Sequence, residues 1–434
     1  MQTKAKEKIN IVTLGCAKNL VDSEVLMTQL RGNKKDVFHQ REDINPDIVI
    51  INTCGFIDKA KQESIDTILK HAKEKEDGII KKLYVTGCLS ERYKDDLKTD
   101  IPEVDGFYGT RDLPELLKNF EAKYRNELLG DRIITTDSHY AYLKISEGCD
   151  RPCSFCAIPL MRGRHISKPI DQIIIEAKNL VRNGVREIML IAQDSTYYGI
   201  DIYKKRAMSE LLKKLSDVEG LDWIRIHYAY PAGFPMDIIE VMRERHNICN
   251  YLDIPLQHGS TNMLKVMKRG ITREKTDELI KNIRDINPEI ALRTTLIAGH
   301  PGETERDFQE MYDFVERSQF DRLGIFTYSH EEGTSAHKLE DDVPEQVKRS
   351  RSNKIMALQQ KISTEKNKNK VGKTVKVLID RVDANNYYGR TEQDSPEVDN
   401  EVIIPSKEMH LRVGDFYDVK ITDSKEYDLI GKVD

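Results

Sequence analysis

The sequence predicts an α/β protein in three parts: an N-terminal doubly wound parallel sheet, a central TIM-like β/α barrel and a C-terminal OB-like β-barrel. Short apolar runs alternate with amphipathic helical stretches over residues 7–125, and this alternation resumes over residues 135–366. Short strands separated by turn residues replace it over residues 369–434. A chain of 434 residues is also long enough for about three domains. We therefore expect domains at 7–125, 135–366 and 369–434.

Three apolar runs predict the strands of the first part. They cover Ile9–Leu14, Asp47–Asn52 and Leu83–Thr86, and helical stretches follow them at residues 19–30, at 58–75 and from residue 90 onwards. Cys16, Cys54 and Cys88 each come just after one of these strands. Because open α/β sheets place their ligand sites at the carboxyl ends of strands, we expect these three thiols to converge at one edge of the sheet.

Six further strands separated by helical stretches fit a partial or full β/α barrel. We expect the strands at Ala141–Ile145, Glu187–Ala192, Trp223–His227, Tyr251–Ile254, Ala291–Ile297 and Arg322–Thr327. Helical patterns between them include residues 171–182 and 273–284, and a charged helix over 344–370 leads out of the barrel. Catalytic groups of such a barrel are expected at the carboxyl ends of its strands.

The composition argues against a membrane-spanning protein and against a secreted, disulfide-bonded one. The chain has no run of about 18 apolar residues and no apolar segment of signal-peptide type, so we expect a cytoplasmic protein with no membrane partner. Its seven cysteines are an odd number, which is untypical of a secreted disulfide framework. Residues 371–434 hold 14 acidic and 9 basic side chains, a balance of −5 that equals the net charge of the whole chain. Such an acidic module favours a basic protein partner over a phosphate backbone.

The cysteines that carry most information are Cys149, Cys153 and Cys156, three thiols within eight residues. Iron–sulfur clusters are normally held by four thiolates, so this loop has either a distant fourth ligand or one iron left open for a small molecule. Zinc is the alternative, but no second cysteine pair follows, and His165 lies in a polar Arg-Gly-Arg-His stretch. We therefore favour a cluster with an open iron.

The spacing Cys-x3-Cys-x2-Cys after the first barrel strand, with Phe155 before the last cysteine, resembles the radical S-adenosylmethionine (SAM) superfamily. The order of the three parts resembles its methylthiotransferases over essentially the whole chain, with the C-terminal part similar to their TRAM domain. This resemblance implies a 4Fe-4S cluster on Cys149, Cys153 and Cys156 whose open iron binds S-adenosylmethionine. It also implies a second 4Fe-4S cluster on Cys16, Cys54 and Cys88 that carries the inserted sulfur.

Two branches of this family differ in substrate, which is a tRNA adenosine in one and an aspartate of ribosomal protein S12 in the other. Residues 13–24, 52–58, 251–258 and 293–304 resemble the second branch, and Cys16 lacks the Gln-Met-Asn type continuation of the tRNA branch. His300 departs from the family pattern, in which phenylalanine is more frequent near Gly299. The resemblance implies methylthiolation of an aspartate β-carbon by radical chemistry, with a second S-adenosylmethionine as methyl donor. A tRNA methylthiotransferase, a two-cluster electron carrier and a zinc RNA-binding protein stay as alternatives.

We further expect ribosomal protein S12 as the partner, no direct nucleic-acid binding, and a monomer; the residues identify neither the electron donor nor the sulfur source. Phe155, Gln193, Asp194, Arg293 and Gly299 are the candidate cofactor-binding residues.

Each of these candidates except Phe155 has a structural alternative. Gln193 and Asp194 could cap the next helix, Arg293 could pair with a barrel carboxylate, and Gly299 could serve a turn. We expect packing roles for His227, His258 and His300, and a buried free thiol at Cys249.

Overall fold

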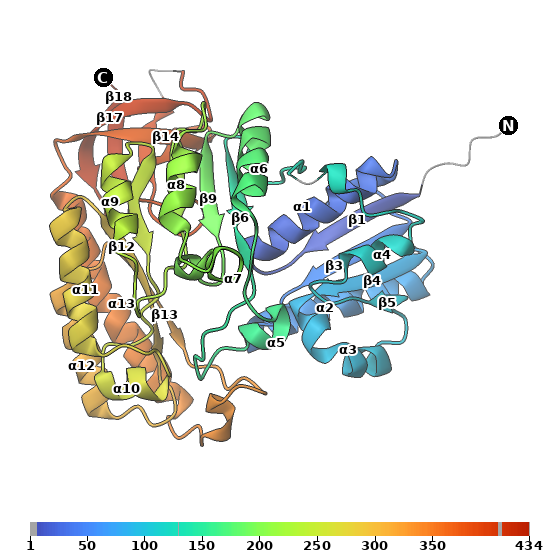
Figure 1. The fold of residues 1–434 in the computed structure, drawn as a ribbon, viewed down its shortest axis with the longest axis horizontal. Helices are drawn as coiled ribbons and strands as arrows, with labels where there is room; N and C mark the ends of the chain where they lie inside the picture. Colours follow the sequence, from blue (N-terminus) through green and yellow to red (C-terminus); the bar gives the residue numbers. More distant parts are fainter. Residues whose placement is uncertain (1–6, 129, 407–409, 434) are drawn as a thin grey trace.

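The structure is a computed structural model that describes residues 7–128, 130–406 and 410–433. Three bodies follow one another along the chain: an N-terminal α/β sheet, a central sheet wrapped by helices, and a C-terminal β-barrel that covers one end of the central sheet (Figure 1). The predicted domain boundaries at 7–125, 135–366 and 369–434 remain predictions. No helix in the described ranges has both the length and the apolar character needed to cross a membrane.

The N-terminal sheet contains five parallel strands in the order β2-β1-β3-β4-β5. Its strands are β1 (Lys8–Thr13), β2 (Asp36–His39), β3 (Ile48–Thr53), β4 (Lys82–Gly87) and β5 (Gly106–Phe107). Its helices are α1 (Ala17–Gly32), α2 (Asp58–Glu76), α3 (Cys88–Asp100) and α4 (Leu113–Lys118). The order reverses between β1 and β3, and ligands of open α/β sheets bind at such a reversal.

Both faces of this sheet are covered, which explains why its strands are continuous apolar runs. Ile9, Ile11 and Ile50 point to the face that α1 and α4 cover, whereas Val49 and Ile51 point to the face covered by α2 and α3. Alternate residues of β3 therefore enter two separate cores. This is the doubly wound arrangement that the sequence predicts.

The central sheet is open, with six parallel strands in the order β13-β12-β11-β10-β9-β6, so the partial barrel is the form adopted. Its strands are β6 (Tyr140–Lys144), β9 (Glu187–Ile191), β10 (Trp223–Ile226), β11 (Ile248–Asp253), β12 (Ala291–Ala298) and β13 (Arg322–Thr327). Its helices are α6 (Ile170–Arg182), α7 (Ile200–Tyr203), α8 (Met208–Ser216), α9 (Asp237–Glu244), α10 (Thr261–Val266), α11 (Arg273–Ile286) and α12 (Glu305–Ser318). Each expected strand overlaps an observed one.

The long helix α13 (Glu345–Lys368) runs beside β13 and leads to the C-terminal body, as predicted. That body is a closed barrel in the order β14-β15-β16-β18-β17. Its strands are β14 (Thr374–Val382), β15 (Asn386–Arg390), β16 (Val402–Pro405), β17 (Phe416–Ser424) and β18 (Leu429–Val433). Apolar side chains such as Val377, Ile404 and Val419 fill its interior.

Residues 391–401, which connect β15 to β16, form an insertion loop that reaches the central sheet. All six strands of that sheet contact either this loop or Arg390, which immediately precedes it. The contacting side chains are Tyr140 and Tyr142 of β6, Glu187 of β9, Arg225 of β10, Asn250 and Tyr251 of β11, Arg293 of β12 and Arg322 of β13. The loop therefore attaches the C-terminal barrel to the central sheet.

Candidate functional site: two cysteine triads

The first triad consists of Cys16, Cys54 and Cys88, which the N-terminal sheet brings to one edge as predicted. Cys16 is the N-cap residue of α1, Cys54 follows β3, and Cys88 begins α3 directly after β4. Cys16 is exposed, whereas Cys54 and Cys88 are buried. Two of the three sulfurs therefore lie at helix N-termini, where the helix dipole favours a negatively charged ligand.

The backbone at Gly15 packs tightly against Cys54. A Cβ atom added to Gly15 would lie 2.6 Å from Cys54 Cβ and 2.8 Å from Cys54 Sγ. Burial raises the pKa of Cys54, and it raises the pKa of Cys88 to about 12. A buried thiolate therefore needs a positive partner, and a metal ion is the partner that removes such a proton outright.

The second triad, Cys149, Cys153 and Cys156, lies on the loop between β6 and α6. A small antiparallel ribbon of β7 (Ser146–Glu147) and β8 (Ile166–Ser167) closes this loop at its base. The Cys149 backbone N–H donates to the Gly163 carbonyl at 3.0 Å, and the Ser154 N–H donates to the Met267 carbonyl at 3.0 Å. These hydrogen bonds fix a loop that has little regular structure of its own.

Two thiols of the second triad, Cys149 and Cys156, are also largely desolvated. Burial raises the pKa of Cys149 to about 11 and that of Cys156 to about 12. The guanidinium of Arg269 donates from Nη1 to Cys153 Sγ at 3.1 Å, and the Tyr230 hydroxyl lies 3.9 Å from the same sulfur. This site therefore combines apolar burial with one cationic hydrogen-bond donor.

Arg162 joins the two triads. It ends α5 (Ile158–Arg162), the helix that follows Cys156 and packs against α3 of the N-terminal body. Its Nε donates to Cys88 Sγ at 3.2 Å, and its Nη2 donates to Asn19 Oδ1. Its Nη1 donates to Asp22 at 2.6 Å and to Glu147 at 3.2 Å, and Lys144 pairs with the same two carboxylates. A partly buried network of charges therefore extends from Cys88 to Glu147, two residues before Cys149.

Gln193 and Asp194, predicted at the end of a barrel strand, lie beside the second triad. Gln193 Nε2 donates to Glu147 at 2.9 Å, while its buried Oε1 has no hydrogen-bond partner among the described residues. Asp194 accepts from the Thr196 N–H at 2.9 Å, which is the predicted capping role, and it pairs with Arg151 at 2.7 Å. Gln193 therefore retains an acceptor for a ligand, whereas the contacts of Asp194 are made within the protein.

For the other three candidate cofactor-binding residues, the structure shows contacts within the protein. Arg293 pairs with Asp253 at 3.1 Å and with Asp399 of the insertion loop at 3.3 Å, so the barrel carboxylate of the alternative interpretation is present. Gly299 has a φ of +77°, and an added Cβ would collide with Lys348. Phe155 and His300 form a T-shaped pair, with ring centroids 6.5 Å apart. The cofactor roles of these three residues remain predictions.

The histidines and Cys249 have surroundings consistent with packing. His227 contacts Ser395 of the insertion loop at 3.0 Å, His258 lies 3.3 Å from Glu303, and His300 lies 3.3 Å from Ser154 Oγ. Each of these three side chains is buried. Cys249 is a buried free thiol, as expected.

Sequence reasoning missed the residues that connect the sites: Asn19, Glu147, Arg162, Tyr230 and Arg269. Arg162 lies six residues after Cys156 in a Met-Arg-Gly-Arg stretch, so its closeness to the cysteine loop was the available signal. Arg269 follows α10, more than a hundred residues beyond Cys153, and gives no comparable signal. Its position becomes visible only when the strands are assembled.

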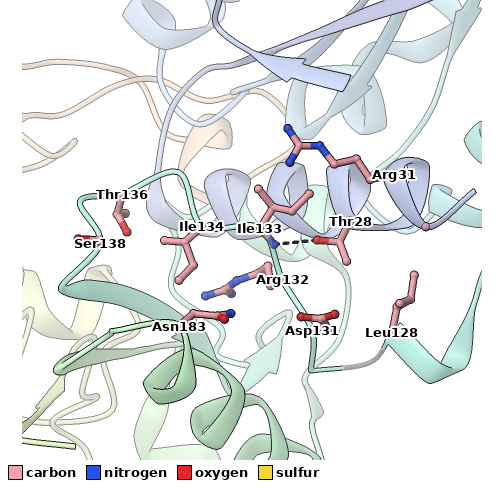
Figure 2. Close-up of a pocket in the computed structure, with 11 residues that line it drawn as sticks. Thr28, Arg31, Leu128, Asp131, Arg132, Ile133, Ile134, Thr136, Ser138 and Asn183 are labelled. Carbon is pink, nitrogen blue, oxygen red and sulfur yellow. Dashed lines mark hydrogen bonds between the residues drawn. The ribbon is translucent and has the colours of Figure 1, made fainter. Parts of the chain in front are cut away.

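Two pockets lie between the N-terminal body and the central sheet. One of about 530 Å³ lies between α1 and residues 131–138, where the Ile133 N–H donates to Thr28 Oγ1 at 2.8 Å (Figure 2). No cysteine lines it. A smaller pocket of about 230 Å³ is lined by residues that include Asp22, Asn52 and Lys144, and it borders the Arg162 network.

The open β/α sheet with three cysteines after its first strand defines a radical SAM enzyme. Residues 143–315 match the Radical SAM superfamily, residues 8–109 match "Uncharacterized protein family UPF0004", and residues 371–433 match the TRAM domain. A radical S-adenosylmethionine methyltransferase from Kitasatospora setae, TsrM, solved with cobalamin and a [4Fe-4S] cluster bound, has a similar fold. Its TM-score is 0.55 at 14% identity, over 74% of this chain and 72% of that one.

Full-length relatives narrow the class. The "Ribosomal protein uS12 methylthiotransferase RimO" of Cytophaga hutchinsonii is 60% identical over 99% of this chain and 98% of its own. The RimO protein of Bacteroides fragilis is 53% identical over 99% of both chains. The chain therefore belongs to the RimO family of radical SAM methylthiotransferases.

Proposed function

We propose that the protein methylthiolates the β-carbon of an aspartate of ribosomal protein uS12. The observation that carries this proposal is the pair of cysteine triads joined by Arg162, because sulfur insertion at an unactivated carbon needs both a radical source and a sulfur source. Cys149, Cys153 and Cys156 would hold one 4Fe-4S cluster and leave an iron for S-adenosylmethionine. Cys16, Cys54 and Cys88 would hold a second 4Fe-4S cluster.

The residues present suit these groups. Each triad offers three sulfurs in a partly buried site with one arginine donor, at Cys88 and at Cys153. Among the described residues, no three His, Cys, Asp or Glu side chains lie close enough to hold a single metal ion. A 4Fe-4S cluster makes no such demand, because each of its cysteines binds a different iron.

When bound, the two clusters and S-adenosylmethionine supply a hydrogen-abstracting radical, the sulfur and the methyl group. The protein positions and encloses this chemistry. Gln193 offers its unpartnered Oε1 as an acceptor close to the second triad, where an ammonium group of a ligand could donate to it. Phe155, Asp194, Arg293 and Gly299 remain our further candidates for cofactor contact.

A basic ribosomal protein suits the acidity of the C-terminal barrel. Residues 371–434 carry a balance of −5, which favours a cationic protein surface and repels an RNA backbone. The uS12 substrate is also named for the RimO relatives. We further propose that the enzyme works in the cytoplasm as a monomer.

Anaerobic reconstitution tests this proposal in two steps. Purified protein loaded with iron and sulfide should produce 5′-deoxyadenosine from S-adenosylmethionine and dithionite, and Cys153→Ala should abolish this production. Incubation with uS12 and, separately, with tRNA should then give a methylthio group on the protein aspartate, detected by peptide mass spectrometry. A methylthio nucleoside in the tRNA digest instead would overturn the substrate assignment.

A further inference from the structure

The side chain of Arg162 is only 2% exposed, yet all three of its guanidinium nitrogens have polar partners. One partner is a sulfur, Cys88 Sγ, in another body of the fold. A buried arginine is costly unless its hydrogen bonds and its charge are satisfied, so this position is strongly specified. Asp22 and Glu147 supply the compensating charge.

The partners of Arg162 also fix the first triad geometrically. Asn19 accepts from Arg162 and donates to the carbonyls of Leu14, two residues before Cys16, and of Thr53, directly before Cys54. On the opposite side, Glu147 holds Arg162 two residues before Cys149. One guanidinium therefore contacts Cys88 directly, reaches the segments before Cys16 and Cys54 through Asn19, and contacts Glu147 before the second triad.

A cation that donates a hydrogen bond to a ligating sulfur stabilises the more negative, reduced form of an iron–sulfur cluster. Hydrogen bonds to the sulfurs, net charge and exposure to solvent are the levers that set cluster potentials. Arg162 provides the first two at Cys88, and Arg269 provides them at Cys153 in the other triad. The potentials of the two sites would therefore be set by different arginines.

We propose that Arg162 is a positioning residue that raises the reduction potential of the cluster on Cys16, Cys54 and Cys88. This inference rests on the proposed function, because it requires that triad to hold a cluster. Through its hydrogen bond to Cys88, Arg162 stabilises the reduced cluster. Through its contact with Glu147, it also connects this site to the loop of the second triad. Its removal leaves Cys88 without a cationic donor, and Lys144 as the remaining cationic partner of Asp22 and Glu147 among the described residues.

The test uses the full chain with Cys149, Cys153 and Cys156 changed to alanine, so that iron binds only at the first triad. After anaerobic reconstitution, a redox titration followed by electron paramagnetic resonance gives the midpoint potential. Arg162→Met should make it more negative by at least the equivalent of a tenfold change in the oxidised-to-reduced ratio, about 59 mV for one electron. The potential of Arg162→Lys should lie between those of Arg162→Met and the unchanged chain.

Two matched variants separate this effect from general damage. Arg111 donates to the carbonyls of Arg162 and Arg164 but touches no cysteine, so Arg111→Met should leave the potential unchanged. In the reciprocal chain, with Cys16, Cys54 and Cys88 changed to alanine, Arg269→Met should shift the potential and Arg162→Met should not.

The outcomes separate the two proposals. If the first triad binds no iron when Arg162 is intact, the two-cluster function fails. If iron binds and Arg162→Met leaves the potential where it was, the role of Arg162 is wrong. If both Arg162→Met and Arg162→Lys fold but bind no iron, Arg162 is a structural requirement of the site and not a determinant of its potential.

Discussion

At the residue scale, glycines stand directly before cysteines in both triads. Gly15 precedes Cys16 with a φ of +90°, and Gly148 precedes Cys149 with a φ of +77°. A side chain at either position would be strained, because L-residues rarely adopt this left-handed conformation. It would also collide with neighbours, which are Cys54 at the first site and the Gly163 and Arg164 carbonyls at the second. The glycines therefore let the chain turn tightly into each ligand loop.

Gly15→Ala should empty the first triad. The added methyl group would lie 2.8 Å from Cys54 Sγ, and the left-handed backbone adds a cost of about 1–2 kcal/mol. Iron bound per reconstituted chain should fall by about half, because one of two four-iron clusters is lost. Gly324→Ala is the control, since nothing lies within 4 Å of its added carbon. Full iron content in Gly15→Ala would contradict this steric reasoning.

Gln193→Ala should weaken binding of S-adenosylmethionine. Its Oε1 is a buried acceptor with no partner among the described residues, and a hydrogen bond to a charged group contributes about 1.5–3 kcal/mol. The dissociation constant should rise by about ten- to a hundredfold, as measured by equilibrium dialysis on the reconstituted protein. Gln309→Ala, on an exposed part of α12, should have no effect. Equal affinities for the two variants would exclude Gln193 from the binding site.

Local sequence signals predicted the cysteines but not their arginines. A cysteine that follows an apolar run marks a strand end, and strand ends meet at one sheet edge, so Cys16, Cys54 and Cys88 could be grouped. Arg269 reaches Cys153 from a turn after α10, and no rule of spacing connects residues that far apart. Such partners depend on how the loops of several strands are assembled.

At the element scale, the apolar runs predicted strands well where the runs were long. The short edge strands β2 (Asp36–His39) and β5 (Gly106–Phe107) were missed, because Asp-Val-Phe-His and Gly-Phe contain no continuous apolar run. The insertion loop was missed for another reason. Its sequence, Thr-Glu-Gln-Asp-Ser-Pro-Glu-Val-Asp-Asn-Glu, resembles a solvated turn, yet the carboxylates of Asp394 and Asp399 are buried against Arg322 and Arg293 of the central sheet.

Asp394→Asn should loosen the C-terminal barrel from the central sheet. Asp394 is buried against Arg322, and it also accepts a hydrogen bond from Thr391 at 2.6 Å. Removal of one partner from a buried ion pair costs about 3–5 kcal/mol, because the other charge stays buried and unpaired. Urea unfolding should show this loss. Asp418→Asn, exposed on β17, should stay within about 0.5 kcal/mol of the unchanged protein; an equal loss in both variants would contradict the assignment.

At the scale of the whole molecule, ion pairs hold the C-terminal barrel against the central sheet. Arg390 joins Glu187 of β9 to Asp380 of β14, and Arg225 also pairs with Glu187. Burial opposes ionisation of these carboxylates, but the neighbouring arginines outweigh it and lower the pKa of both Glu187 and Asp380. Arg322 and Lys370 likewise outweigh burial at Asp394, so its pKa is lowered too.

This junction should therefore weaken in acid. A carboxylate with a lowered pKa in the folded state adds stability above its ordinary pKa, near 4, and loses it as pH falls through the folded value. The contact between the C-terminal barrel and the central sheet should be intact at pH 7 and should weaken progressively below about pH 4. The single tryptophan, Trp223, reports on this junction because its ring lies 4.7 Å from that of Phe416 in β17.

As the pH is lowered from 7, the tryptophan emission maximum should shift to the longer wavelength typical of a solvent-exposed ring. This shift should come before the helical circular dichroism signal is lost. Asp394→Asn should reduce the steepness of this shift, because one carboxylate with a lowered pKa no longer titrates. Asp418→Asn should leave the profile unchanged. A profile that is identical in all three proteins would show that the pH dependence arises elsewhere than at the buried carboxylates of the junction.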